Sequence, residues 1–291
     1  NGVAVSSTDT LTGDNFGLTS FTPTNISVTD SNFRFGQYAE NNTGIYADNG
    51  SVIDVNNGTN TISDGLNNGT TMSDNTGNQN IMFYSTGTWK QATHNLTTGG
   101  NLGAFEGLGS QINITASKVI MTSKNSTVYS AKDSGIITVG TSTTGADTVA
   151  QGKQSTIAYS EGLNSQIIIN GNLIAADENL FGSNNSNPTI TADAFNNVGA
   201  YALNGGLVKV ASKSTADTTA ALPSTYAAYT NSMIYGLGAV ADGDVTYTGT
   251  LGTNTVASKV DFDTGVAIAT GTKGGLLARN NGLIEFTGNI I

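Results

Sequence analysis

Trp89, Lys90 and His94 are the residues of this chain whose types and spacing best fit a binding site. Trp89 is the only tryptophan and His94 the only histidine among the 291 residues. A tryptophan beside a cation is the kind of anchor that protein interfaces use. These residues predict recognition of a partner at positions 85–100, with the alternative that Trp89 caps the end of a hydrophobic core.

Nucleophilic catalysis has one faint candidate in the sequence. Lys132-Asp133-Ser134-Gly135 is similar to the Gly-Asp-Ser-Gly turn of trypsin-like proteases, but a lysine stands where that turn requires its first glycine. The chemistry also needs an imidazole base, and His94 lies too close in sequence for a protease of two barrels. We predict that Ser134 is a turn residue and that the chain has no catalytic residue.

Two pairs of aspartates raise the question of a calcium site. They lie in Asp242-Gly243-Asp244 and Asp261-Phe262-Asp263. Calcium takes several carboxylates, and an EF-hand loop needs further acids and a terminal glutamate that neither run supplies. Aspartates are common in turns, so we predict neither a metal site nor a cofactor.

A strand-turn-strand unit recurs along the chain and must position any such site. Each copy has a short apolar strand, a turn of Asn, Gly or Ser, and a second strand that alternates apolar and polar residues. Copies run over residues 44–55, 199–210 and 275–286, with looser ones at 103–114, 128–139 and 158–169 and a stretched one joining Ile234-Tyr235 to Val245-Thr246-Tyr247. Repeats of this length indicate a solenoid.

The unit predicts an all-β fold, a parallel β-helix of about eight to ten rungs. One two-strand unit cannot bury its apolar face, whereas stacked units build a continuous core. We therefore expect Val55, Val139 and Val210 to lie in one vertical file, and further strands at Ile26-Ser27-Val28 and Ile81-Met82-Phe83. Helix is disfavoured by the abundance of Thr, Ser, Asn and Gly, and the only helical candidate, 219–229, contains Pro223.

Aromatic residues recur at one position of the unit. If they point inward they form a ladder that supports the core, which the polar Glu106 beside Phe105 favours; if they point outward they form a flat platform for sugar rings or a partner protein. The members of this predicted file are Tyr46, Phe105, Tyr129, Tyr159, Tyr201 and Tyr235.

Parallel β-helices also include enzymes that act on polysaccharides, and these need clustered acids with Arg or Lys nearby. The only arginines, Arg34 and Arg279, lie near opposite ends of the chain. The predicted outward positions of the wall bring no two acids onto neighbouring rungs. These positions are Asp54, Asn113, Thr138, Ile168, Lys209, Thr246 and Glu285. We predict that the chain is not an enzyme, and a polysaccharide-active enzyme stays an alternative.

Charge excludes two classes of partner. The formal net charge is −10, with only 11 Lys and Arg residues. Nucleic acid and anionic membrane surfaces both require a basic footprint. No apolar run is long enough to span a membrane, so this segment is not expected to insert directly. The absence of cysteine is uninformative about compartment, because a long stacked core needs no disulfide.

We expect one domain over residues 1–291, with less regular first rungs over 1–40, because no shift of composition divides the chain. Both ends look cut, and we interpret the chain as a fragment of a longer rod. Four excursions interrupt the pattern, at 56–80, 85–100, 176–197 and 211–232. Long loops on compact folds commonly carry function.

The phrase Gly44-Ile45-Tyr46-Ala47-Asp48-Asn49-Gly50-Ser51 and its copies at Gly199 and Gly275 resemble the passenger repeats of type V autotransporters. The cysteine-free, arginine-poor background is similar to the same family, in particular to large adhesins of fusobacterial type. The resemblance covers about residues 40–290 as a pattern. It implies a right-handed parallel β-helix, export, and display outside the cell through a C-terminal β-barrel that this chain lacks.

We therefore expect a bacterial surface adhesin or stalk, anchored in the outer membrane through the missing barrel and possessing loops on a rigid rod. Its partner would be a host-cell or bacterial surface protein or glycan. A purely structural cell-surface spacer is the other alternative, and the sequence does not distinguish it from an adhesin.

Overall fold

The computed structural model describes residues 25–29, 41–48, 50–58, 61–63, 79, 81–90, 95–96, 100–101, 106–121, 125–141, 143, 145–150, 154–175, 197–211, 233–234, 236–249, 252–268 and 275–290. These residues form strands and turns, and no helix occurs among them. No described segment is therefore a helix suited to crossing a membrane. The helical candidate at 219–229 and most of the predicted irregular rungs over 1–40 lie outside the described residues.

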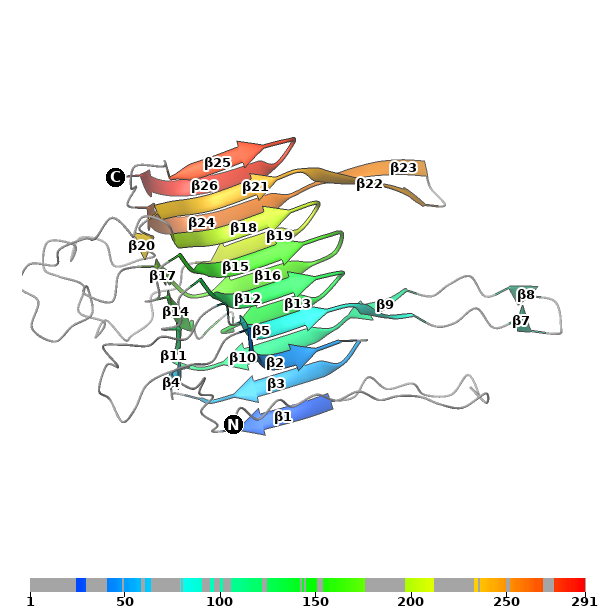
Figure 1. Ribbon diagram of the computed structural model, residues 1–291, viewed down its shortest axis with the longest axis horizontal. Coiled ribbons are helices and arrows are strands. Elements are labelled where there is room, and N and C mark those ends of the chain that lie inside the picture. Colours follow the sequence, from blue (N-terminus) through cyan, green and yellow to red (C-terminus); the bar gives the residue numbers. More distant parts are fainter. Residues whose placement is uncertain are drawn as a thin grey trace, which may run out of the picture.

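Three parallel sheets make up the body of the fold (Figure 1). Sheet I has seven strands, in the order β2 (Thr43–Ala47), β5 (Ile81–Thr86), β12 (Thr127–Lys132), β15 (Thr156–Glu161), β18 (Asn197–Leu203), β21 (Gly236–Asp242) and β25 (Leu276–Arg279). Sheet II has eight, in the order β1 (Asn25–Thr29), β3 (Val52–Asn56), β10 (Gln111–Thr115), β13 (Ile136–Val139), β16 (Gln166–Asn170), β19 (Leu207–Ala211), β24 (Lys259–Ile268) and β26 (Leu283–Ile290). Sheet III has five, in the order β4 (Thr61–Ser63), β11 (Lys118–Met121), β14 (Asp147–Ala150), β17 (Leu173–Ala175) and β20 (Met233–Ile234).

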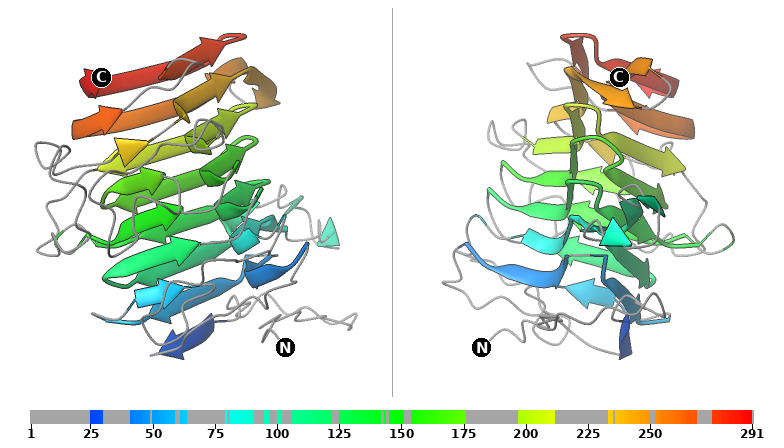
Figure 2. Two further views of the ribbon diagram at one scale, coloured as in Figure 1. Left: turned by 60° about the vertical axis from the view of Figure 1, so that its left-hand side comes forward. Right: turned by 90° about the vertical axis from the view of Figure 1, so that its right-hand side faces the viewer.

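The chain visits the sheets in turn. β12, β13 and β14 belong to sheets I, II and III, and β15, β16 and β17 repeat the same circuit one strand further along each sheet. Figures 1 and 2 show the strands of the sheets stacked along one common axis. Because each circuit places its strands on those of the previous one, the strands pair in parallel. This stacking confirms the predicted solenoid-like architecture of parallel strands.

The core is built from register files, meaning residues at equivalent positions of successive strands. Val55, Val139 and Val210 lie in one file of sheet II, linked through Ile114 and Ile169. All five are at most 1% exposed, as predicted. Along each strand the side chains alternate sides, which gives β16 its alternation of half-buried and buried residues. Each such buried side chain stabilises the fold by about 1.5–3 kcal/mol.

Sheet I departs from simple alternation. Met82 and Phe83 are consecutive and both buried, as are Val128 and Tyr129. The Tyr129 hydroxyl lies 2.8 Å from the hydroxyl of Thr148 on β14, so its ring crosses the interior from sheet I to sheet III. Its ring also stacks on Phe83, with centroids 5.6 Å apart. Phe83 and Tyr129 thus contribute a stacked aromatic pair to the core, with Tyr129 reaching from sheet I to sheet III.

Two predicted units are wrong in part. Ile234 lies in β20 of sheet III, and residues 245–247 leave the stack, whereas the wall of that circuit consists of β21 and β24. Similarly, residues 106–109 do not belong to sheet I, and β5 is the sheet I strand that precedes β10. In both cases a chain excursion separates the two wall strands. The nine-residue spacing therefore identified the wrong first strand for the copy at 103–114, and neither predicted strand of the stretched copy belongs to the wall pair.

Candidate functional site

The predicted binding residues lie on an excursion between β5 and β10. Trp89 and Lys90 belong to β6 (Thr88–Lys90), which pairs antiparallel with β9 (Glu106–Gly109), Lys90 opposite Glu106. Further out, β7 (Asn95–Leu96) pairs with β8 (Gly100–Asn101). The side chains of Trp89 and Lys90, and all of His94, lie outside what the structure describes. Recognition by these three residues therefore stays a prediction.

A second excursion, between β21 and β24, is described in more detail. It is the hairpin formed by β22 (Asp244–Gly249) and β23 (Gly252–Ala257), which pair antiparallel along their full length. Figure 1 shows this hairpin projecting from the edge of the stack, on the same side as β9. Sequence reasoning assigned these residues to the wall because Val245-Thr246-Tyr247 alternates as wall strands do.

The hairpin presents polar but uncharged surface. On one side Thr246 pairs with Thr255 and Thr248 with Thr253, with hydroxyl oxygens 3.0 and 3.2 Å apart. On the other side Tyr247, opposite Asn254, is 40% exposed. No charged residue occurs between positions 245 and 257.

Both hairpins leave the stack at one type of turn between sheets I and II. Gly87, Gly162 and Gly243 open this turn in three circuits, with φ of 76°, 92° and 78°. Ser110, Ser165 and Ser258 close it, and all three are fully buried. Between glycine and serine the chain inserts residues 88–109, 163–164 and 244–257 respectively. The hairpins are therefore insertions of different length into one shared turn.

The closing serine fastens each turn to a neighbouring circuit. Ser165 Oγ accepts the N–H of Ser134 at 2.9 Å, and Ser258 Oγ accepts the N–H of Gly205 at 2.9 Å. Ser258 also donates to the carbonyl of Asp242 at 2.7 Å. A buried donor without a partner would be costly, so these hydroxyls secure the base of the insertions.

The circuits that lie between those of Gly87, Gly162 and Gly243 use a shorter turn, which ends in glycine. Residues Asp133-Ser134 and Asn204-Gly205 adopt positive φ, and Gly135 and Gly206 follow. A Cβ on Gly206 would lie 2.3 Å from the carbonyl oxygen of Ser160. Ser134 is thus a turn residue as predicted, with its hydroxyl donating to the carbonyl of Leu163 at 3.2 Å.

Polar contacts hold the base of the β22–β23 hairpin against β25. Arg279 forms an ion pair with Asp242 at 2.6 Å, and Asn280 donates to the same carboxylate at 2.8 Å. Asn281 donates to Asp244 at 3.0 Å. Arg279, and then Asn280, hold the pKa of Asp242 below its ordinary value of 3.8. Asp242 and Asp244 are thus engaged in fixing where the hairpin leaves the stack.

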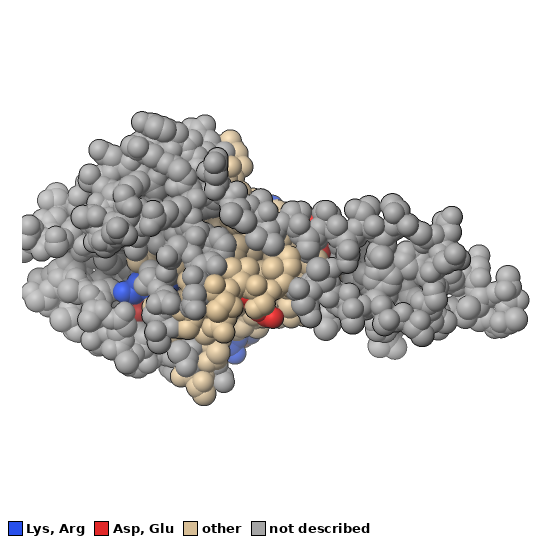
Figure 3. Space-filling view, turned by 90° about the horizontal axis from the view of Figure 1, so that it is seen from below, with Lys and Arg blue, Asp and Glu red and all other residues tan. Residues whose placement is uncertain are grey.

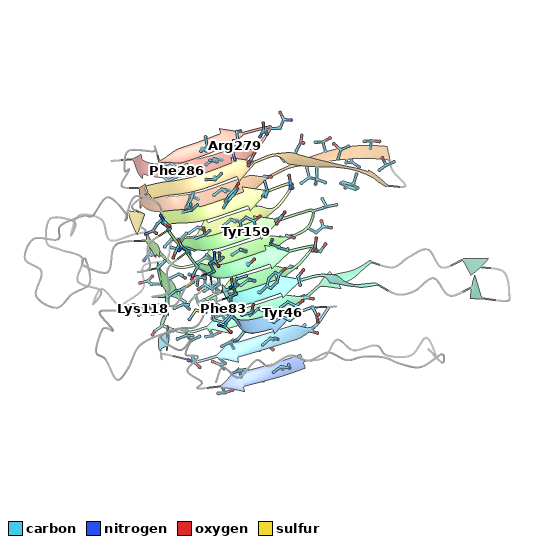
Figure 4. All side chains as sticks on the ribbon, viewed as in Figure 1. Tyr46, Phe83, Lys118, Tyr159, Arg279 and Phe286 are labelled. Carbon is cyan, nitrogen blue, oxygen red and sulfur yellow. The ribbon has the colours of Figure 1, made fainter. Side chains whose placement is uncertain are left out.

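The predicted aromatic file divides between the two faces of sheet I. Tyr46, Tyr84, Tyr159 and Tyr201 share a register file with Ser130 between them, and the four tyrosines are half-buried on the outer face. Tyr46 and Tyr159 are labelled on their strands in Figure 4. Tyr129 lies one position away and points inward, so its assignment to the same file was wrong. Phe105 and Tyr235 lie outside the described residues.

The inward orientation that the sequence favoured is wrong for Tyr46, Tyr159 and Tyr201, and the outward rings do not form the flat platform that was the alternative. Tyr46 and Tyr84 lie 5.3 Å apart with their planes at 50°, and Tyr159 and Tyr201 lie 5.4 Å apart at 84°. The tilt allows ring edges to contact ring faces, an arrangement that aromatic pairs prefer to direct overlap. The file is therefore a row of two tilted pairs.

An ion pair borders this row of tyrosines. Glu161 accepts from Tyr159 at 2.8 Å and pairs with Lys132 at 2.9 Å. Lys132 lies 5.1 Å from the centre of the Tyr159 ring. Lys132 chiefly lowers the pKa of Glu161, whereas burial and the Glu161 hydrogen bond raise the pKa of Tyr159. The outer face of sheet I thus combines aromatic rings with paired charges.

Asp261 and Glu285 lie on neighbouring strands of sheet II, although the sequence predicted no two acids on neighbouring rungs. Asp261, and not Thr246, follows Lys209 in the outward file, and Glu285 is its neighbour on β26. Lys259 pairs with both carboxylates, at 3.6 and 2.8 Å. The expectation that no two acids meet on neighbouring strands is wrong here, because the hairpin insertion shifted the assignment of the strand. Lys259 bridges the two carboxylates and so links the neighbouring strands β24 and β26.

Figure 3, a view from below, shows Lys, Arg, Asp and Glu atoms at only a few places among the described residues visible on that face. Among the described residues no group of three His, Cys, Asp or Glu side chains is placed to hold a metal ion. Comparison with known proteins gives no family model, no curated protein and no solved structure that matches this chain.

Proposed function

We propose that this chain is a segment of a bacterial surface adhesin or stalk, of the type V autotransporter passenger class, built as a right-handed parallel β-helix. In this proposal each strand of sheet II marks one rung, which gives eight rungs. With neighbouring strands about 4.8 Å apart, eight rungs extend over about 34 Å. The segment would lie outside the cell, anchored in the outer membrane through a C-terminal β-barrel.

The stack supports a spacer role through its rigidity. Buried files run through many circuits, and each circuit pairs its backbone with those on either side. Such an array bends little, because any bend would break hydrogen bonds in several sheets together. A stiff body of this kind is suited to holding contact elements away from a cell surface.

The observation that carries the adhesin proposal is the β22–β23 hairpin. It extends from a turn that another circuit closes with Leu163 and Asn164 alone. Residues 246–248 and 253–255 are exposed, including the aromatic Tyr247. The stack does not need such an insertion, so we assign it to contact with a partner, a host-cell or bacterial surface protein or glycan. The excursion with Trp89, Lys90 and His94 would be a second contact element at the same edge.

The chain offers a matched control for testing this assignment. Replacing residues 244–257 by Leu-Asn would recreate, between Gly243 and Ser258, the short turn that runs from Gly162 to Ser165. Both glycines have positive φ, and both serines bond a neighbouring turn, so the stack should tolerate the change. Thermal unfolding would verify that the body remains folded.

Binding of the wild type and the replaced variant to cells and to a glycan array then tests the proposal. We expect the wild type to bind and the replaced variant to lose a large part of that binding. Equal binding by both would refute the role of the hairpin. Absence of binding by the wild type would favour the purely structural spacer.

The outer face of sheet I supports glycan binding as a second candidate. The half-buried Tyr159 and Tyr201 form a tilted pair beside the carboxylate of Glu161, a group that accepts hydrogen bonds from hydroxyl groups. The test is titration of neutral oligosaccharides against Tyr201→Ala and wild type. Hydrolysis of the oligosaccharides in the same assay would instead favour the polysaccharide-active enzyme.

A further inference from the structure

The β22–β23 hairpin has unprotected strand edges. Within the part of the chain that the structure describes, β22 and β23 pair only with each other. Natural proteins usually protect such edges with lysine, proline, a bulge or a covering element. Residues 245–257 contain neither a charge nor a proline, and the pairing from Asp244 to Gly249 is regular throughout.

The composition of the hairpin favours further strand pairing. Residues 245–257 are rich in Thr, with Val and Tyr, which are enriched in strands. An isolated two-stranded hairpin is only marginally stable in water, and pairing with additional strands increases its stability. Both edges are therefore suited to accept another strand.

We infer that the β22 edge pairs with the β22 edge of a second copy of this chain, antiparallel about a two-fold axis at Tyr247. This inference rests on the proposed role of the hairpin as a contact element and names its partner. The pairing would place Thr246 opposite Thr248 of the other copy and Tyr247 opposite its own equivalent. The two hairpins would then form one continuous four-stranded sheet.

Three features of the molecule favour a second copy over a different protein. Two-fold symmetry places alike residues together, and the Thr-Tyr-Thr sequence of β22 is the same read in either direction. An aromatic pair across the axis would cover Tyr247, which is 40% exposed. The chain has a formal net charge of −10, so two copies approach best through a segment that bears no charge.

Single-cysteine variants test the geometry directly, because the natural chain contains no cysteine. Opposed residues of antiparallel strands have Cα atoms about 4.5–5.5 Å apart, within the range that a disulfide spans. Tyr247→Cys should cross-link two copies under mild oxidation. Thr246→Cys and Asn254→Cys should not, since the first lies off the axis and the second on the other strand.

Sedimentation equilibrium of the unmodified chain, at micromolar to millimolar concentrations, supplies the independent measurement. We expect a reversible dimer that the Leu-Asn replacement of residues 244–257 converts to a monomer, and that Tyr247→Lys weakens while Tyr247→Phe preserves. A monomeric wild type overturns the inference, as does preferential cross-linking through Asn254→Cys. If the wild type is monomeric but the replacement still abolishes cell binding, the proposed function stands and only the homotypic pairing fails.

Discussion

The hydroxyl of Ser165 accepts a hydrogen bond from the backbone N–H of Ser134 at 2.9 Å, joining two turns that are 31 residues apart. Ser165 is fully buried, and its own carbonyl accepts from Ser160 at 2.9 Å. One small side chain thus connects consecutive circuits at the corner between sheets I and II, where the hairpins also begin.

Removing this hydroxyl should destabilise the stack. In Ser165→Ala the N–H of Ser134 loses its partner in a half-buried turn, and we expect a loss of about 1–2 kcal/mol in the free energy of unfolding. Urea unfolding measures it. Thr138→Ala, on the half-exposed outer side of β13, is the control and should change stability little. Equal effects of the two would show that the Ser165 bond contributes nothing.

The short turns should not tolerate a side chain at their last residue. In Gly206→Ala the new Cβ would lie 2.3 Å from the Ser160 carbonyl oxygen, so neighbouring circuits must separate. We expect a loss of more than about 2 kcal/mol, measured by the unfolding midpoint. Gly58→Asn is the control, because the space around Gly58 is open and asparagine tolerates its positive φ. A stable Gly206→Ala protein would contradict the close approach of these strands.

The buried hydrogen bond between the hydroxyls of Tyr129 and Thr148 should contribute more to the free energy of unfolding than an exposed tyrosine hydroxyl does. Tyr129→Phe leaves the buried Thr148 hydroxyl without this partner, and we expect a loss of about 1–2 kcal/mol. Tyr129→Ala should cost about 3–5 kcal/mol, because it adds a cavity. Tyr84→Phe, on the outer face of sheet I, should be nearly neutral. The same unfolding assay compares the three variants, and a neutral Tyr129→Phe would refute the argument.

Acid should weaken the outer face of sheet I and the base of the hairpin. The pKa values of Glu161 and Asp242 are lowered in the folded state, chiefly by Lys132 and Arg279. Their stabilisation is therefore complete above the ordinary values of 4.5 and 3.8 and is lost as the pH falls through the folded values.

The measurement is the unfolding midpoint as a function of pH, from neutral to about pH 3. The double variant Glu161→Gln with Asp242→Asn should be less stable at neutral pH and should lose less on acidification than the wild type. Parallel curves for the two proteins would contradict the assignment of these carboxylates.

Alkali should act through Tyr159 in the opposite direction. Burial and the bond to Glu161 raise its pKa in the folded state above the ordinary 10.0, so its contribution is present below pH 10 and is lost as the pH rises further. Ultraviolet titration of the wild type should show one tyrosine ionisation at a higher pH than that of free tyrosine, and this ionisation should be absent from the Tyr159→Phe variant. An ionisation at the ordinary value would show that neither the partial burial of Tyr159 nor its bond to Glu161 persists in solution.

The sequence determined the wall of this protein. The buried positions of the sheet II strands are apolar and the turns between the strands are rich in small residues, so the alternation around Val55, Val139 and Val210 could be recognised without coordinates, as could the turn role of Ser134. Those constraints act on every circuit, and repetition made them visible.

The tertiary structure decided which strand each circuit uses and where excursions begin. Val245-Thr246-Tyr247 alternates equally well in a wall or in a free hairpin, because local alternation reports only that a strand has two different sides. Only the pairing of β21 and β24 with their neighbours shows that residues 244–257 lie outside the stack and that Asp261 meets Glu285. Likewise, a shift of one residue turned Tyr129 inward and Tyr159 outward, since side chains along a strand alternate with a period of two.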